Sequence, residues 1–185
     1  FQLEPVLIDG RAYVRPVLQG GISLPNPGGP QIPVMGELVG IPFGVNVSAR
    51  LIDADYREHG DVLVAPVPHE QILGGGEAAR LTYHANRDDY ETDAYLPVEP
   101  VVISTTGVMR DQRVAALSIR PVQYNPVRRH LRVATRMRIG LQFSAPGVMP
   151  QSVRLPEGRI APELDRFYHR LLVNGTEAGQ WRGRR

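Results

Sequence analysis

The chain has 185 residues, of which 42% are hydrophobic, enough for one core and a short tail. No apolar run approaches the roughly 18 residues that a membrane-spanning helix requires, so we expect no membrane span. The sequence contains no cysteine, which excludes disulfides, thiolate nucleophiles and zinc–thiolate sites. Its first residues lack the pattern of a signal peptide, so a signal peptide, if the protein has one, lies upstream.

Charge is divided unevenly along the chain. Residues 50–100 contain eleven acidic residues and four arginines, a net charge of −7. Residues 101–185 contain five acidic residues and fifteen arginines, a net charge of +10. A basic surface can bind nucleic acid, but these arginines alternate along one strand or lie in the tail, and no nucleic-acid motif accompanies them. We therefore expect an exposed strand face and no nucleic-acid partner.

The first part of the chain predicts antiparallel strands. Phe1–Asp9 and Ala12–Val17 are joined at Asp9-Gly10, a residue pair typical of tight hairpin turns. Residues 19–33 are irregular, whereas residues 46–55 alternate between apolar and polar side chains. That alternation predicts a strand with one buried face.

The middle of the chain predicts two short strands that flank long loops. Asp61–Pro66 is a short apolar run typical of a buried strand, and residues 101–105 predict another. Between them, residues 66–80 show no periodicity and include Gly74-Gly75-Gly76. Residues 81–100 are polar and acidic. Loops on a rigid sheet often carry function, so the glycine-rich loop is a candidate site.

The stretch from residue 113 to residue 143 predicts an antiparallel hairpin. Leu131 to Phe143 alternate apolar residues with arginines, and residues 115–119 form a second alternating run. The link between them reads Pro-Val-Gln-Tyr-Asn-Pro from residue 121, and an Asn-Pro pair favours a turn. We assign Tyr124, Asn125 and Pro126 to a structural corner that sets the hairpin register.

After this hairpin the sequence changes character. Residues 146–161 are rich in proline and glycine and predict a linker, and residues 162–173 predict the only helix, ended by Asn174-Gly175. The predicted fold is all-β, an antiparallel β-sandwich of jelly-roll type with a short C-terminal helix. We divide the chain into a sandwich (1–145), a linker (146–161) and a helix with a basic tail (162–185).

No catalytic or metal site emerges from the residues themselves. The five histidines lack metal-ligand spacing, there is no Gly-x-Ser-x-Gly motif, and the glycine triplet lacks the Gly-Lys-Ser/Thr of a phosphate loop. We expect no cofactor. One acidic cluster has oxygen ligands that calcium would accept, but a solvated loop is the favoured interpretation for Asp88, Asp89, Glu91 and Asp93.

Several segments together are similar to one known family. They are Gly29–Pro33, Asp61–Pro66, Tyr95–Pro97, Met109–Val114 and, most specifically, Pro121–Pro126 followed by Leu131-Arg132-Val133. With these motifs in order over residues 1–143, the chain resembles the N-terminal prodomain of gingipain-type cysteine peptidases, family C25. The resemblance implies a bacterial protein that is secreted or held at the cell surface.

The resemblance also implies a function. Such prodomains assist folding of the adjoining peptidase domain and block its active-site cleft until they are cut away; the catalytic cysteine and histidine belong to the peptidase. The implied partner is the cognate C25 catalytic domain. In arginine-specific gingipains a basic residue of the inhibitory loop occupies the specificity pocket of the peptidase. At the aligned point, near Ile72 and Leu73, this chain has no arginine. The implied inhibitory loop comprises Pro66, Val67, Pro68, His69, Glu70, Gln71, Ile72, Leu73, Gly74, Gly75, Gly76 and Arg80.

The C-terminal arginines are the second candidate site. We expect Arg182, Arg184 and Arg185 to form an exposed basic site in a mobile tail, which proteases cut readily. The functional interpretation is a processing site that releases the prodomain. The alternative is a basic tail without such a role.

Two other functions stay open. The chain could be a β-sandwich module that binds carbohydrate or mediates adhesion, although 6% aromatic residues and one tryptophan, Trp181, offer little surface for sugar stacking. Alternatively, the partner could be a surface-processing peptidase of the type IX secretion pathway. The sequence leaves oligomeric state undecided.

Overall fold

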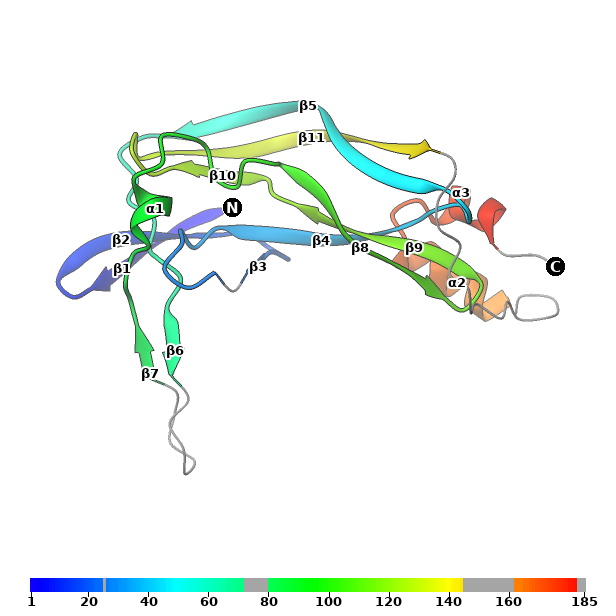
Figure 1. The fold of residues 1–185 in the computed structure, drawn as a ribbon, viewed down its shortest axis with the longest axis horizontal. Helices are drawn as coiled ribbons and strands as arrows, with labels where there is room; N and C mark the ends of the chain where they lie inside the picture. The colour runs from blue at the N-terminus through cyan, green and yellow to red at the C-terminus, as the bar shows by residue number, and fades with distance from the viewer. Residues whose placement is uncertain (25, 72–79, 145–161, 183–185) are drawn as a thin grey trace. The chain divides into compact units, whose positions relative to one another are not determined.

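The computed structural model describes residues 1–24, 26–71, 80–144 and 162–182 (Figure 1). They form two compact units that each combine three segments of the chain. Unit 1 contains Phe1–Met35, Ala54–Pro100 and Arg120–Met137, and unit 2 contains Gly36–Asp53, Val101–Ile119 and Arg138–Arg185. The predicted linker at 146–161 lies outside the described residues, so the predicted domain boundaries stay a prediction.

Unit 1 begins with the predicted hairpin. Strand β1 (Gln2–Ile8) pairs antiparallel with β2 (Arg11–Val17), and Ile8 lies opposite Arg11. Asp9 and Gly10 connect them with φ angles of 49° and 79°. Positive φ at both central residues is the type I′ turn, which matches the right-handed twist of paired strands. The hairpin prediction is confirmed.

The second hairpin differs from its prediction. The supposed link forms strand β10 (Val122–Asn125), which pairs antiparallel with β11 (His130–Ser144). The alternating run before it belongs to β9 (Gln112–Ile119), which pairs with β8 (Val101–Met109) in another sheet. The sequence hid β10 because the strand has only four residues and runs directly into the Asn-Pro pair that favours a turn, although its residues alternate between apolar and polar.

These two strand pairs belong to the two larger sheets of the described residues. A four-stranded sheet has the order β3-β4-β9-β8, where β3 is Ile22–Ser23 and β4 is Pro33–Gly40. A three-stranded sheet has the order β10-β11-β5, where β5 is Asn46–His59. The predicted strand at 46–55 is thus confirmed and continues further. Strand β4 was not predicted, because its buried residues lie at both ends rather than at alternate positions.

The core of unit 1 forms around Tyr124. Its side chain is 0% exposed and belongs to a cluster with Val62, Val64, Leu131 and Val133. The phenol donates a hydrogen bond to the carbonyl oxygen of Val62 at 3.0 Å. Burial raises the pKa of the Tyr124 phenol, which keeps it protonated as a donor. Apolar burial and one satisfied polar group therefore fix β10 against the 62–64 segment.

The Asn-Pro corner is held by polar contacts. Asn125 donates its Nδ2 to Asp93 Oδ1 at 2.8 Å, and its Oδ1 accepts from the backbone N–H of Arg128 at 3.0 Å. Arg128 Nε in turn donates to Asp93 Oδ1 at 2.7 Å. The pKa of the Asp93 carboxyl is lowered, chiefly by the hydrogen bonds from Arg128 and Asn125. These contacts support the structural role assigned to the corner.

Unit 2 has two apolar clusters. One joins Ile41 and Val39 of the β4 region to Val101, Ala115 and Leu117. The other packs the C-terminal helices onto the sheet; it contains Val114, Tyr168, Leu172 and Ala178. Tyr168, and not its neighbour Phe167, faces inward: Tyr168 is 0% and Phe167 49% exposed.

Helical structure is more extensive than predicted. The predicted helix is α2 (Pro162–Leu171), and a second short helix α3 (Gly175–Ala178) and a 3₁₀ turn η1 (Gly179–Trp181) follow. A one-turn helix α1 (Arg87–Tyr90) lies within the predicted acidic loop. One turn is too short to produce helical periodicity in a sequence.

One predicted strand is an extended segment without a regular ladder. Residues 61–66 form only isolated bridges, from Val64 to Val14 and from Pro66 to Pro30. Proline at 66 has no backbone N–H to donate, which disfavours a regular ladder at that position. The prediction that the segment is buried is correct for Val62 and for residues 64–66.

Replacing Tyr124 by phenylalanine tests the buried hydroxyl. Tyr124→Phe leaves the Val62 carbonyl without this donor, so we expect the free energy of unfolding to fall by about 1–2 kcal/mol in urea titrations. The control is Tyr56→Phe, which keeps a ring that stacks on Arg132 and removes a hydroxyl without a hydrogen bond among the described residues. Equal losses in the two variants would contradict the role of the Tyr124 hydrogen bond.

The Asp93 corner predicts a pH-dependent stability. A carboxyl whose folded pKa lies below its ordinary value of 3.8 stabilises the fold above that pH and loses this contribution as the pH falls through the folded pKa. Asp93→Asn should therefore unfold more readily than the native chain at pH 7, and the difference should vanish in strong acid. Asp9→Asn, at the exposed β1–β2 turn, controls for the loss of one carboxylate. A difference that persists unchanged below the folded pKa would overturn the assignment.

Candidate functional site

The predicted inhibitory loop forms a projecting hairpin arm in unit 1. Its strands are β6 (His69–Gln71) and β7 (Arg80–Thr82), which pair antiparallel with Gln71 opposite Arg80. In Figure 1 the two strands run side by side, away from β1, β2 and α1 of the same unit. All three residues of β6 are exposed. The predicted loop residues Ile72, Leu73, Gly74, Gly75 and Gly76 lie outside the described residues.

The strand register assigns side chains to the two faces of the arm. Residues directly opposite each other in an antiparallel pair share a face, and successive residues alternate. Glu70 therefore shares one face with Leu81, whereas Gln71 shares the other with Arg80. Arg80, although nine positions after Gln71, returns to the same level of the hairpin. Arg80 is exposed, and it is the only arginine in the strands β6 and β7.

The first leg of the arm emerges from a fixed segment. The backbone N–H of Ala65 donates to the Val14 carbonyl at 2.9 Å, and the N–H of Gln31 donates to the Ala65 carbonyl at 2.8 Å. The N–H of Val67 then donates to Gly29 at 2.8 Å. With neighbours bonded on both sides, residues 62–67 can hold the start of the arm in one position.

Gly28 ties the two legs of the arm together. Its N–H donates at 2.9 Å to the carbonyl of Val67, where the first leg begins, and its carbonyl accepts at 2.8 Å from the N–H of Asn86, where the second leg ends. Its φ is +85°, which favours glycine. A Cβ on this residue would lie 2.9 Å from the His84 carbonyl oxygen and 3.1 Å from the Asn86 nitrogen. Both the backbone angle and the close approach therefore require glycine.

The second leg returns to the first through α1. Asn86 caps this helix by accepting from the N–H of Asp88 at 3.1 Å. Tyr90 at the helix end donates its hydroxyl to the Val64 carbonyl at 2.8 Å, and burial raises the pKa of this phenol. The rings of His69 and His84 lie 6.0 Å apart at the root of the arm. Both legs thus end on the 62–67 segment.

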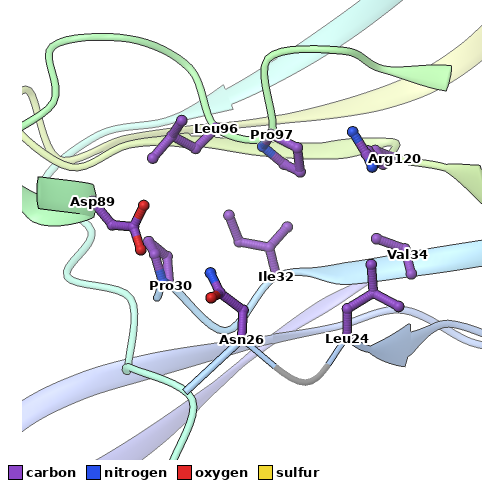
Figure 2. Close-up of a pocket in the computed structure, with 9 residues that line it drawn as sticks. All are labelled: Leu24, Asn26, Pro30, Ile32, Val34, Asp89, Leu96, Pro97 and Arg120. Atoms are coloured by element: carbon purple, nitrogen blue, oxygen red, sulfur yellow. The ribbon is translucent and has the colours of Figure 1, made fainter. Parts of the chain in front are cut away.

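An apolar groove lies beside the arm's root in the same unit. It has a volume of about 250 Å³. Figure 2 shows Leu96, Pro97 and Arg120 along one side, facing Leu24, Asn26, Pro30, Ile32 and Val34, with Asp89 at one end. Its size and apolar walls would accept one apolar side chain. None of the nine lining residues is aromatic, so the groove offers no sugar-stacking platform.

The acidic cluster uses its carboxylates in ion pairs. Asp93 pairs with Arg128 at 2.7 Å, and Glu91 pairs with Arg87 at 2.8 Å. Asp88 and Asp89 lie in the first turn of α1, where negative charge favours the helix dipole. Within the described residues no three potential ligands gather into a metal site. The cluster is thus tied into the corner and α1.

Of the three arginines in the predicted processing site, the structure describes only Arg182. The expectation that Arg182 is exposed is wrong: the residue is only 6% exposed. Its Nη1 donates to Asp165 Oδ1 at 2.6 Å, and its guanidinium lies over the Tyr168 ring at 4.6 Å. A carboxylate and an aromatic face make burial of this charge tolerable. Arg184 and Arg185 lie outside the described residues.

Sequence reasoning singled out this segment as a loop but predicted neither its two strands nor the residues that fix it. Gly28, Asn86 and Tyr90 were not singled out. The available signal was the Asn-Pro-Gly-Gly-Pro run at 26–30, whose residue types mark turns with positive φ. No sequence pattern indicated that this turn would meet residues from two other segments.

The whole arrangement matches a known family. The model of the Propeptide_C25 family matches residues 1–153. The chain belongs to the C25 propeptide family. As a propeptide it is the non-catalytic part of a peptidase precursor, so the family prediction is confirmed.

Curated relatives of this C25 propeptide come from Porphyromonas gingivalis. Gingipain R2 is 23% identical over 130 residues, which cover 70% of this chain and 17% of the relative. Lys-gingipain is 22% identical over 177 residues, which cover 92% of this chain and 10% of the relative. The chain therefore spans a small part of these relatives.

Two solved structures share the fold. The complex of the Porphyromonas gingivalis RgpB pro- and mature domains matches with a TM-score of 0.78 and 20% identity, over 95% of this chain and 87% of the matched chain. The structure that addresses zymogenic latency of gingipain K, from the same organism, matches with a TM-score of 0.60 and 23% identity, over 77% and 81%. The prediction of an all-β antiparallel fold with a short C-terminal helix is confirmed.

Membrane insertion through a helix has no candidate in the described ranges. Within them, no helix combines the length and the apolar character that crossing a bilayer requires.

Gly28 provides a test of the arm's root. Gly28→Ala should lower the hydrogen-exchange protection of the Asn86 amide by about tenfold or more, because the new Cβ meets backbone atoms and φ is positive. Gly20→Ala is the matched control: Gly20 has a φ of +75° and open space around the Cβ position, so it reports the cost of the angle alone. If both variants protect Asn86 equally, Gly28 does not hold the legs together.

Proposed function

We propose that this C25 propeptide keeps its cognate peptidase domain latent by laying the β6–β7 arm across the active-site cleft. The observation that carries the proposal is an arm with exposed strands whose two legs are both bonded to one glycine. Family membership and the fold shared with a solved complex of pro- and mature domains support it. The partner is therefore the catalytic domain of the same precursor, a gingipain-type cysteine peptidase.

The physical mechanism is occlusion by a held strand. An extended segment can add main-chain hydrogen bonds along a cleft, while its side chains enter the specificity pockets. Binding costs less free energy when the segment is already ordered, because little conformational entropy remains to be lost. Bonds at Val67 and Asn86 order both legs before the peptidase arrives. In this proposal the residues between the two strands, 72–79, are the part of the chain that acts on the catalytic site.

Two features would add to this mechanism. The excess of acidic residues between 50 and 100 would steer the domain toward a basic face of the peptidase and raise the rate of association. The same surface would also serve as a template while the peptidase folds, which is the second task we assign to the chain. Release would follow cleavage in the C-terminal tail, and the precursor would act outside the cell or at its surface.

A carbohydrate or adhesion module is not supported by a specific feature. The groove beside the arm lacks aromatic residues, and Trp181 packs edge-on against Phe143 with ring centroids 5.6 Å apart. A surface-processing peptidase of the type IX secretion pathway stays an alternative partner within the family. The catalytic domain that follows in the precursor would identify it.

Inhibition in trans tests the proposal. The 185-residue chain is titrated into its cognate catalytic domain, alongside a variant in which residues 72–79 are replaced by Asn-Gly. A two-residue turn closes the Gln71–Arg80 pair without changing the strand register. We expect tight inhibition by the native chain and a loss of about 100-fold or more in the variant, with unchanged thermal unfolding, because only the arm's reach is removed.

A substitution far from the arm serves as the control for this assay. Replacing Asp9 by asparagine in the β1–β2 turn of unit 1 should leave inhibition unchanged. Equal inhibition by the shortened arm would move the inhibitory site elsewhere on the chain. Failure of the native chain to bind at micromolar concentrations would overturn latency by occlusion, and would direct attention to a folding role or to sugar ligands.

A further inference from the structure

The C-terminal end of unit 2 is fastened at several points. Asn174 brackets Gly40 of β4: its Oδ1 accepts from the Gly40 N–H at 2.7 Å, and its Nδ2 donates to the Gly40 carbonyl at 2.9 Å. The N–H of Val173 donates to the Leu38 carbonyl at 2.9 Å. Beyond these bonds, Ala178 is fully buried against the same sheet. The chain up to Ala178 is therefore part of the fold.

Trp181 and Arg182 extend this attachment into the tail. The Trp181 ring packs against Phe143 at the end of β11. Arg182 places its side chain over the Tyr168 ring and pairs with Asp165, which is in the first turn of α2. Tyr168 is itself fixed, since its hydroxyl donates to the Met109 carbonyl at 2.6 Å and to Asp111 Oδ1 at 3.0 Å. Arg182 thus occupies a formed, charged site.

A peptidase that cuts after arginine needs that side chain for its own pocket. It also needs the flanking backbone in an extended form, so a bond in a packed segment is cut only from the fraction of molecules in which the segment has opened. Removing Arg182 from Asp165 and Tyr168 would break an ion pair and expose the aromatic face. The bond that follows Arg182 is therefore protected in the folded state.

We propose that Arg182 is a latch and not a cleavage site. Its attachment to Asp165 and Tyr168 holds the helical end of the propeptide on the sheet, and it directs arginine-specific processing to Arg184 or Arg185. The inference rests on the proposed processing of this tail. Its consequence is that the propeptide keeps Arg182 when it is severed and leaves as an intact folded unit.

The test compares cleavage rates at neighbouring arginines. The 185-residue chain, carrying a Gly/Ser extension of about ten residues, is exposed to dilute trypsin and its products are followed by intact mass. Products ending at residue 184 or 185 should appear at least about tenfold faster than the product ending at residue 182. Cleavage after Arg113, which is buried in unit 2, reports unfolding of that unit as an internal standard.

Matched variants separate the latch from general stability. Asp165→Asn should accelerate cleavage after Arg182 about tenfold, with no change after Arg113, because it releases the contact with Arg182 and otherwise only the exposed pair of Asp165 with His169 on the same helix. Glu177→Gln removes an exposed carboxylate of α3 and should change neither rate. Arg182→Lys keeps a residue that trypsin cuts but loses the planar stack on Tyr168, so it should also be cut faster.

Three outcomes would overturn the latch. The first is equal cleavage rates after Arg182 and Arg184 in the native chain. The second is that neither Asp165→Asn nor Arg182→Lys accelerates cleavage after residue 182. The third is that cleavage after residue 182 accelerates only when cleavage after Arg113 accelerates as well. The inhibition assay is independent of these rates. A chain that protects Arg182 but does not inhibit the peptidase would refute the proposed function alone, and the reverse result would refute the latch alone.

Discussion

The extended segment from residue 62 to residue 67 is the constraint on which unit 1 depends. A buried segment outside a regular ladder must find partners for its peptide groups, because an unpaired buried N–H or carbonyl costs as much as a lost hydrogen bond. Tyrosine hydroxyls satisfy the carbonyls of Val62 and Val64, and backbone bonds satisfy Ala65 and Val67. These partners come from four separate parts of the chain: Val14, residues 28–31, Tyr90 and Tyr124. The segment therefore forms only when they all assemble.

The arm inherits its position from that segment. Its first leg leaves directly after Val67, and its second leg returns through Asn86 to Tyr90, which bonds the same segment. A hairpin of two short strands is marginally stable in water by itself. Here the backbone bonds of Gly28 to Val67 and Asn86 already hold the two legs side by side, so β6 and β7 do not have to bring them together. This division leaves the side chains of β6 exposed for a partner.

The sequence predicted those elements whose pattern is local. The β1–β2 turn followed from Asp9-Gly10, and β11 followed from its alternation, because a strand with one wet face shows its period. Strand β10 and helix α1 were missed for the same reason: each has only four residues, too few to establish a period in the sequence. In the candidate site, residues 66–80 were singled out as a loop because of their glycines and their place in the family pattern. Gly28 was missed because its role arises from contacts with distant segments.

The arginines show most clearly that a sequence does not reveal contacts between distant segments. Alternation assigned them to a solvated face, yet several serve as structural cations. Arg132 lies between the rings of Tyr56 and Tyr95, at 4.6 and 4.0 Å, and buried Arg113 donates to the carbonyls of Pro42 and Val45. A planar guanidinium can stack and donate in one plane at once, which lysine cannot do. A sequence gives the charge of such a residue but not its partners. Arg182 is the third example: the sequence placed it in an exposed tail, whereas the structure buries it against the carboxylate of Asp165 and the ring of Tyr168.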